Sequence, residues 1–98
     1  FKVSQTRSDE LFYQDINICL DECERRMNEW DNYPNEVRLI LANMAFNLGI
    51  TRLLKFQKMF AALNSGDYVQ ASIEGLDSRW AKQVYNRAHR LMDRLRSI

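Results

Sequence analysis

The residues of this sequence that could carry acid–base chemistry are thirteen carboxylates and a single histidine, His89. General acid–base catalysis needs such a group in a cleft, with a pKa shifted by burial or by neighbouring charges. Most of the carboxylates fall at predicted solvent-facing positions of amphipathic helices, where a carboxyl group keeps its ordinary acidity. The chain also contains no G-x-S-x-G, P-loop or dinucleotide-binding motif. We therefore predict no catalytic residue and no cofactor.

The two cysteines do not indicate a disulfide or a metal site. Cys19 and Cys23 are four residues apart on one predicted helix, so they share a face but are poorly placed to bond to each other. We expect free, core-facing thiols. A structural zinc site usually takes four Cys or His ligands, and this chain has only these two and His89. We predict no metal.

Charge is divided unevenly along the chain. Residues 9–31 hold eight acids and two bases, whereas residues 79–98 hold six bases and one acid. The basic segment could meet nucleic acid or an anionic cell-wall polymer, but the acidic first helix is an equally good partner. We do not expect nucleic acid, because the bases alternate with core positions and no groove-reading motif is recognisable.

The spacing of apolar residues predicts an all-α protein with a single helical domain over residues 1–98. Only three glycines and one proline interrupt a chain that is 46% hydrophobic, and its apolar residues recur with helical periodicity. A chain of this size buries roughly two thirds of its unfolded surface. With no run of 18 apolar residues and no signal-peptide pattern, we expect a soluble chain without a membrane span.

We expect about six helices wrapped around a central apolar helix. The first spans residues 8–29, with Ser8 as its N-cap. The second, residues 36–48, is apolar nearly all round, which marks it as the central helix, and Gly49 is its expected C-cap. A short helix over residues 50–54 follows.

The second half of the chain predicts three further helices. The first covers residues 56–63 and stops at an Asn-Ser-Gly sequence. Asp67 is the expected N-cap of the next, in which Gly75 weakens the last turn. Ser78 then caps one segment with apolar positions from Trp80 to Leu95, and we assign Trp80 to the core.

Two asparagines, Asn43 and Asn47, interrupt the apolar central helix. Asparagine is a mediocre helix former because its side chain competes with the backbone for hydrogen bonds. Each must therefore be satisfied internally or face something polar, and we expect Asn43 to bond internally.

Five short segments resemble, in order and spacing, the C-terminal helical lobe of phage lysozymes of the T-even type. They are L-F-Y-Q-D at 11–15, N-M-A-F-N-L-G at 43–49, L-N-S-G-D-Y at 63–68, S-R-W at 78–80 and N-R-A-H-R at 86–90. The similarity is collinear from about residue 38 to the end. Members of this family are muramidases that cut peptidoglycan with a Glu in a small N-terminal lobe, followed by an Asp and a Thr.

The catalytic set of the family is incomplete in this sequence. Glu22 and Asp31 have the spacing of its Glu and Asp, but Val37 stands where the Thr should be. Glu74 begins a Glu-Gly-Leu sequence like that of the family, yet Gln83 occupies the Asp position. The resemblance thus implies the lobe that holds the substrate without the lobe that cuts it, so this chain alone should be inactive.

The resemblance also implies four substrate-binding residues: Phe46, Asn47, Glu74 and Arg87. Phe46 would line the sugar cleft, with Asn47 offering an amide to the glycan. Arg87 matches an arginine that reaches toward the catalytic Glu of the other lobe. Glu74, together with Met59, stands where the family has small or amide groups against sugar, which should alter the inherited contacts.

The implied function is substrate binding by the helical lobe of a phage-type lysozyme in cell-wall lysis. The alternative is a non-catalytic, lysozyme-derived structural or regulatory protein that binds a protein partner or a glycan. The expected partners are peptidoglycan or chitin-like oligosaccharides, bound weakly, and a separate catalytic lobe or protein partner. If phage-encoded, the chain would be found in the host cytoplasm or the virion and act on the periplasmic cell wall.

Overall fold

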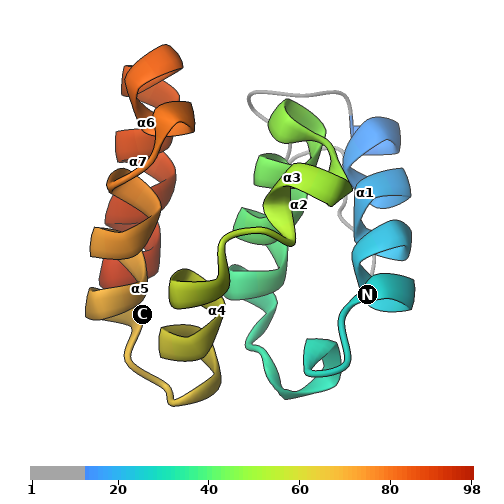
Figure 1. Cartoon of the computed structure of the whole chain (residues 1–98). Helices are drawn as coiled ribbons and strands as arrows, with labels where there is room; N and C mark the ends of the chain where they lie inside the picture. The colour runs from blue at the N-terminus through green and yellow to red at the C-terminus, as the bar shows by residue number, and fades with distance from the viewer. Residues whose placement is uncertain (1–12) are drawn as a thin grey trace. The chain divides into compact units, whose positions relative to one another are not determined.

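The computed structural model describes residues 13–98, and their side chains from residue 17 onward. Seven α-helices and one 3₁₀ turn make up this part of the chain, and it contains no strand (Figure 1). The all-α prediction is confirmed. Ser8, the predicted N-cap of the first helix, lies outside the described residues. The chain divides after Leu53 into two compact units, which we call the first and second units, and the single domain over residues 1–98 stays a prediction.

The first unit is built on the apolar helix predicted to be central. It contains α1 (Tyr13–Arg26), the 3₁₀ turn η2 (Trp30–Asn32), α2 (Asn35–Leu48) and α3 (Ile50–Leu53), and α2 contacts both α1 and α3. The residues of α2 that are buried are Val37, Leu39, Ile40, Leu41, Ala42, Asn43, Met44 and Ala45. Gly49 ends α2 at a φ of 87°, a conformation that favours glycine. The packing of further helices around α2 stays a prediction.

Helix α1 ends at Arg26, three residues earlier than predicted. The chain tightens there, because the Met27 amide donates to Cys23 O and the Trp30 amide donates to Met27 O. This turn places Trp30 in the core at 4% exposure. Arg38 on α2 holds the turn from the other side, since its Nε donates to Trp30 O and its Nη2 to Asp31 O, both at 3.0 Å. Its guanidinium carbon lies 5.8 Å from the centre of the Trp30 ring.

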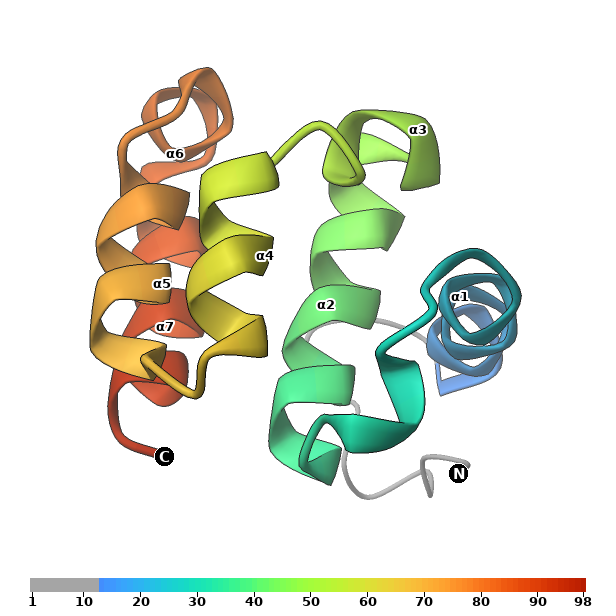
Figure 2. The ribbon, with the colours of Figure 1, turned by 60° about the horizontal axis from the view of Figure 1, so that its bottom comes forward.

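The second unit contains four helices, α4 (Gln57–Asn64), α5 (Tyr68–Leu76), α6 (Arg79–Gln83) and α7 (Tyr85–Arg96). Helix α5 contacts the other three, and Figure 2 shows α4 and α5 side by side. The buried apolar residues of the second unit include Met59, Leu63, Ala71, Trp80, Ala88, Leu91, Met92 and Leu95. The predicted caps are confirmed: an Asp67 carboxylate oxygen accepts from the Gln70 amide at 3.0 Å, and Ser78 Oγ accepts from the Ala81 amide at 3.3 Å.

The last predicted segment is two helices, α6 and α7, instead of one. Val84 adopts φ −125° and ψ 57° and ends α6, while its carbonyl accepts from the Ala88 amide in the first turn of α7. No glycine or proline marks this break, so no local residue pattern predicted it. A β-branched residue has a reduced helix preference, which is consistent with the break at Val84.

Gly75 is a buried residue of α5 that lies close to Met92 of α7. A Cβ atom at this position would lie 2.5 Å from Met92 Sδ and 3.4 Å from Met59 Sδ. Glycine therefore serves a packing role here, in addition to weakening the helix as predicted. None of the helices in residues 13–98 is long and apolar enough to cross a membrane.

Candidate functional site

The second unit contains a pocket of about 430 Å³. One part of its lining is Lys55 to Met59, two residues before α4 and the first three of the helix. The other part is Glu74 on α5 with Asp77 and Ser78 just after it. The Ser78 hydroxyl donates to Gly75 O at 2.7 Å while it caps α6. The loop between α5 and α6 is thereby fixed beside the pocket.

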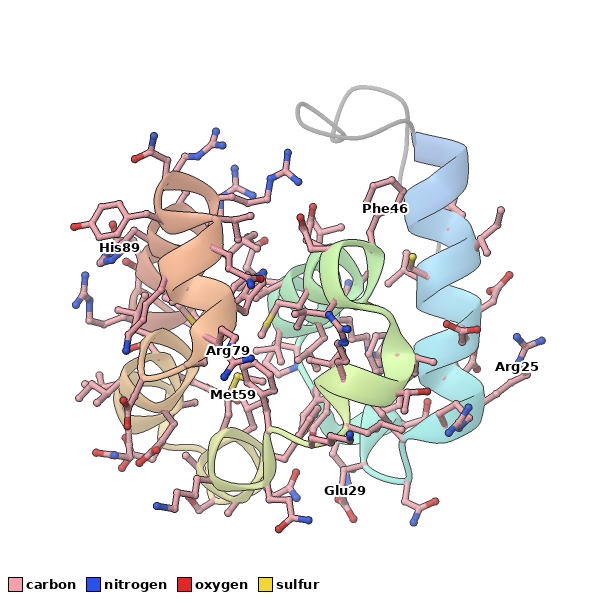
Figure 3. All side chains as sticks on the ribbon, turned by 45° about the horizontal axis from the view of Figure 1, so that its top comes forward. Arg25, Glu29, Phe46, Met59, Arg79 and His89 are labelled. Atoms are coloured by element: carbon pink, nitrogen blue, oxygen red, sulfur yellow. The ribbon has the colours of Figure 1, made fainter. Side chains whose placement is uncertain are left out.

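The apolar lining of the pocket is Met59 and Phe56. Met59 on α4 is 1% exposed, and its side chain points into the interior of the second unit (Figure 3). The half-buried Phe56 ring meets the Trp80 ring edge to face, with centroids 6.3 Å apart. Trp80 is 4% exposed, which confirms its predicted core position, and its Nε1 has no hydrogen-bond acceptor among residues 13–98. An aromatic ring held in this way by packing is a suitable surface for the apolar face of a ligand.

The polar lining carries two charges of each sign. Lys55, Lys58 and Asp77 are exposed, and Glu74 is half-buried. Glu74 Oε2 accepts a hydrogen bond from Gln70 Nε2 at 2.9 Å, which orients this carboxylate. No ion pair joins these lysines to Glu74 or Asp77, although all four side chains line one pocket. Two lysines and two acidic residues therefore line one pocket without neutralising one another directly.

Of the four predicted substrate-binding residues, Glu74 alone lines this pocket, next to Met59. Arg87 is half-buried on α7 of the second unit and is not among the lining residues. Phe46 and Asn47 belong to the first unit. Phe46 is 42% exposed, and Figure 3 shows it near the end of α2. The substrate contacts assigned to all four stay predictions.

The two asparagines of α2 bond to the preceding turn of their own helix. Asn43 Nδ2 donates to Leu39 O, and Asn47 Nδ2 donates to Asn43 O, both at 3.0 Å. The internal bond expected of Asn43 is confirmed. Asn47 is half-buried, and one donor of its amide is engaged by the helix.

Sequence reasoning missed most of the residues that form the pocket. Ser78 was recognised as a helix cap and Phe56 as the first apolar position of a helix, but Lys55, Lys58 and Asp77 gave no signal. Charged residues at helix ends are usually solvated, and only the packing of α4 beside α5 shows that these face a common space.

Neither a metal site nor a reactive thiol accompanies the pocket. Among residues 13–98, no group of three His, Cys, Asp or Glu side chains is placed to hold a metal ion. Cys19 and Cys23, in the first unit, form no disulfide. Burial, with smaller contributions from Cys19 and Glu22, raises the pKa of Cys23 from 9.0 to about 12. A thiol with so high a pKa is a poor nucleophile at neutral pH.

Comparison with known proteins gives two relatives. Residues of this chain are 26% identical over 94 residues to a protein named probable T4-type lysozyme 2 from Dictyostelium discoideum, and this match covers 93% of the chain. They are 36% identical over 62 residues, or 63% of the chain, to the pre-baseplate central spike protein Gp5 of Enterobacteria phage T4. The matches span 55% of the first relative and 11% of the second. No family model matches the chain, and no solved structure gives a significant match.

Proposed function

Because the chain is related to the phage-type lysozymes, we propose that it is the helical, substrate-binding lobe of such an enzyme and that its second-unit pocket holds a saccharide of peptidoglycan. The observation that carries this proposal is the pocket itself. It combines an aromatic ring, a thioether and an oriented carboxylate, Phe56, Met59 and Glu74, in a volume of about 430 Å³. Saccharide sites use an apolar surface with a few convergent polar groups.

The lobe binds glycan without cutting it. Cleavage of a glycosidic bond requires a general acid and a second carboxylate that flank the bond. Glu22 and Asp31 lie in the first unit, on α1 and in η2, and the sequence has no Thr at the third position of the family set. The muramidase activity of the proposed whole enzyme would come from a catalytic lobe that carries the complete Glu, Asp and Thr set.

The binding proposal can be tested by titration of the 98-residue chain with oligomers of N-acetylglucosamine, followed by amide NMR. One pocket with an open face gives few contacts, so we expect millimolar affinity, about −4 kcal/mol. The amides of residues 55–59 and 74–78 should shift, and Phe56→Ala should weaken binding several-fold. Tyr85→Ala is the matched control, because Tyr85 is an exposed aromatic residue of the same unit outside the pocket lining. If the amides of residues 55–59 and 74–78 do not shift at oligomer concentrations well above the millimolar range, the saccharide pocket is refuted.

Phe46 and Asn47, the two residues near the end of α2 that are predicted to bind substrate, give the same titration a second readout. If Phe46 and Asn47 also contact glycan, the amides of residues 46–49 should shift together with those of the pocket. Asn47→Ala should then weaken binding more than it lowers the free energy of unfolding. Shifts confined to residues 55–59 and 74–78 would restrict the glycan site to the second unit.

A second candidate function is that of a non-catalytic structural protein derived from a lysozyme. It is favoured by the 36% identity to a protein named as a baseplate spike component. The two candidates differ in the encoded protein, since a lysozyme requires a lobe with Glu, Asp and Thr at the family spacing. Intact-mass measurement of the protein from its natural source, with peptide sequencing, distinguishes them. Clearing of a cell-wall suspension by the isolated chain would contradict both.

A further inference from the structure

The charges of the second-unit pocket have a sign pattern that a neutral sugar does not match. The two lysines are Lys55, just before α4, and Lys58, in its first turn. The two acidic residues are Glu74, near the end of α5, and Asp77, its C-cap. None of these lysines pairs with either carboxylate. A neutral ligand that entered the pocket would take water from these groups without replacing it by an opposite charge, which is unfavourable.

A ligand with a single charge would fit only part of this lining. A cation would gain from Glu74 and Asp77 but be repelled by the lysines, and an anion would meet the reverse situation. A ligand with an ammonium group and a carboxylate on one small frame can pair with both. We therefore propose that the pocket selects a zwitterionic amino sugar acid, of which muramic acid with a free amine is the simplest example, over N-acetylated sugars.

This inference rests on the proposed saccharide function and specifies the ligand class of that pocket. The carboxylate of Glu74, oriented by Gln70, would receive the sugar ammonium, where an acetamido group would instead present an uncharged amide to a carboxylate acceptor. Lys58 or Lys55 would bind the sugar carboxylate. Exposed charge pairs of this kind change affinity by about threefold to fivefold each, so both together should give about tenfold to twenty-fivefold.

Four monosaccharides that combine these two charges in all four possible ways provide the test, and the charge-removing variants below separate the effect of charge from that of the acetyl and lactyl groups. Glucosamine carries the ammonium alone, N-acetylmuramic acid the carboxylate alone, muramic acid both, and N-acetylglucosamine neither. Dissociation constants would be measured by amide NMR on the whole chain, at low ionic strength and below the pKa of the sugar amine. We expect muramic acid to bind most tightly and N-acetylglucosamine most weakly. The difference should shrink at high salt, because salt screens exposed charges.

Variants that remove one sign of charge assign each preference to one part of the lining. The double variant Glu74→Gln with Asp77→Asn should abolish the gain from the free amine, and Lys55→Gln with Lys58→Gln should abolish the gain from the carboxylate. Asp93→Asn and Lys82→Gln are the controls, because these charged residues belong to the same unit and do not line the pocket. They should leave the order of the four sugars unchanged.

The possible failures are distinguishable. If all four sugars bind the pocket with equal affinity, the saccharide function stands and the charge selection is wrong. If none of them shifts residues 55–59 or 74–78, the proposed function itself is refuted along with the inference. If the Glu74→Gln, Asp77→Asn variant prefers glucosamine and muramic acid over their N-acetylated forms as strongly as the wild type does, the carboxylates of this pocket are not the cause. The inference is then overturned.

Discussion

Removal of the Arg38 guanidinium should destabilise the first unit measurably, although the side chain is only partly buried. Arg38 ties α2 to the turn between α1 and α2 through two backbone carbonyls, those of Trp30 and Asp31. Its guanidinium also lies over the Trp30 ring. Arg38→Ala removes all three contacts at once.

The expected cost follows from the exposure of each contact. The partly buried bond to Trp30 O should contribute about 1 to 2 kcal/mol, and the exposed bond to Asp31 O about 0.5 kcal/mol. Trp30 O keeps a second donor, the Tyr33 amide at 3.2 Å, so it is not left unsatisfied. The cation–π contact adds about 0.5 to 1 kcal/mol. The contact of Nη1 with Asn35 Oδ1, at 3.4 Å, is too long to count. The total is about 2 to 3.5 kcal/mol.

Urea unfolding of the variant and the wild type, monitored by tryptophan fluorescence and circular dichroism, measures this difference. Arg52→Ala on α3 is the matched control, because Arg52 is exposed and has no hydrogen bond or ion pair with another described residue. It should change the free energy of unfolding by less than about 0.5 kcal/mol. Arg38→Lys keeps the charge without the planar fork and should lose about half of the stabilisation. If Arg38→Ala costs no more than Arg52→Ala, the turn is held by the burial of Trp30 alone and the reasoning is wrong.

Three further predictions concern the interiors of the two units. Leu41→Ala, at a residue 1% exposed, should cost about 2 to 5 kcal/mol, a range set by such substitutions in T4 lysozyme; a cost below about 1 kcal/mol in urea unfolding would place Leu41 outside the core. Gly75→Ala should be destabilising by about 1 to 3 kcal/mol in the same assay, despite the better helix propensity of alanine, because the new Cβ would meet Met92 Sδ; an equal or higher stability would show that Met92 moves aside freely. Cys23 should resist Ellman's reagent at pH 8 until the chain unfolds. Because its pKa in the folded chain, about 12, lies above the unfolded value, its contribution to the free energy of unfolding should be present below pH 9 and lost between about pH 9 and 12. Cys23→Ala should lack that alkaline loss.

The parts of the fold that depend on local sequence were predictable. The bounds of α2 differ from the prediction by only one residue, at its start, because a mostly apolar run between Pro34 and Gly49 defines a helix by itself. The caps at Asp67 and Ser78 followed from side-chain chemistry at helix starts. The break at Val84 was missed, because no local breaker residue causes it.

The pocket could not be predicted from local sequence, because its lining comes from segments almost twenty residues apart. The resemblance to a lysozyme lobe indicated Met59 and Glu74 as residues near the substrate, and both line the pocket. The lysines before and within α4 have no periodicity or motif that distinguishes them from surface lysines. Their relevance depends on the packing of α4 beside α5, which is a tertiary property.

The contact between Phe56 and Trp80 gives this chain an intrinsic reporter of pocket occupancy. Phe56 lines the pocket, and its edge-to-face contact with Trp80 would transmit a rotation of the Phe56 ring to the indole as a change in ring-current shift and in fluorescence. The Trp80 Nε1 proton has no acceptor among residues 13–98, so its resonance should lie away from that of a hydrogen-bonded indole. Trp30, in the first unit beside Arg38, supplies a second indole signal as an internal reference. Ligand affinities could therefore be read from one natural side chain in the unlabelled protein.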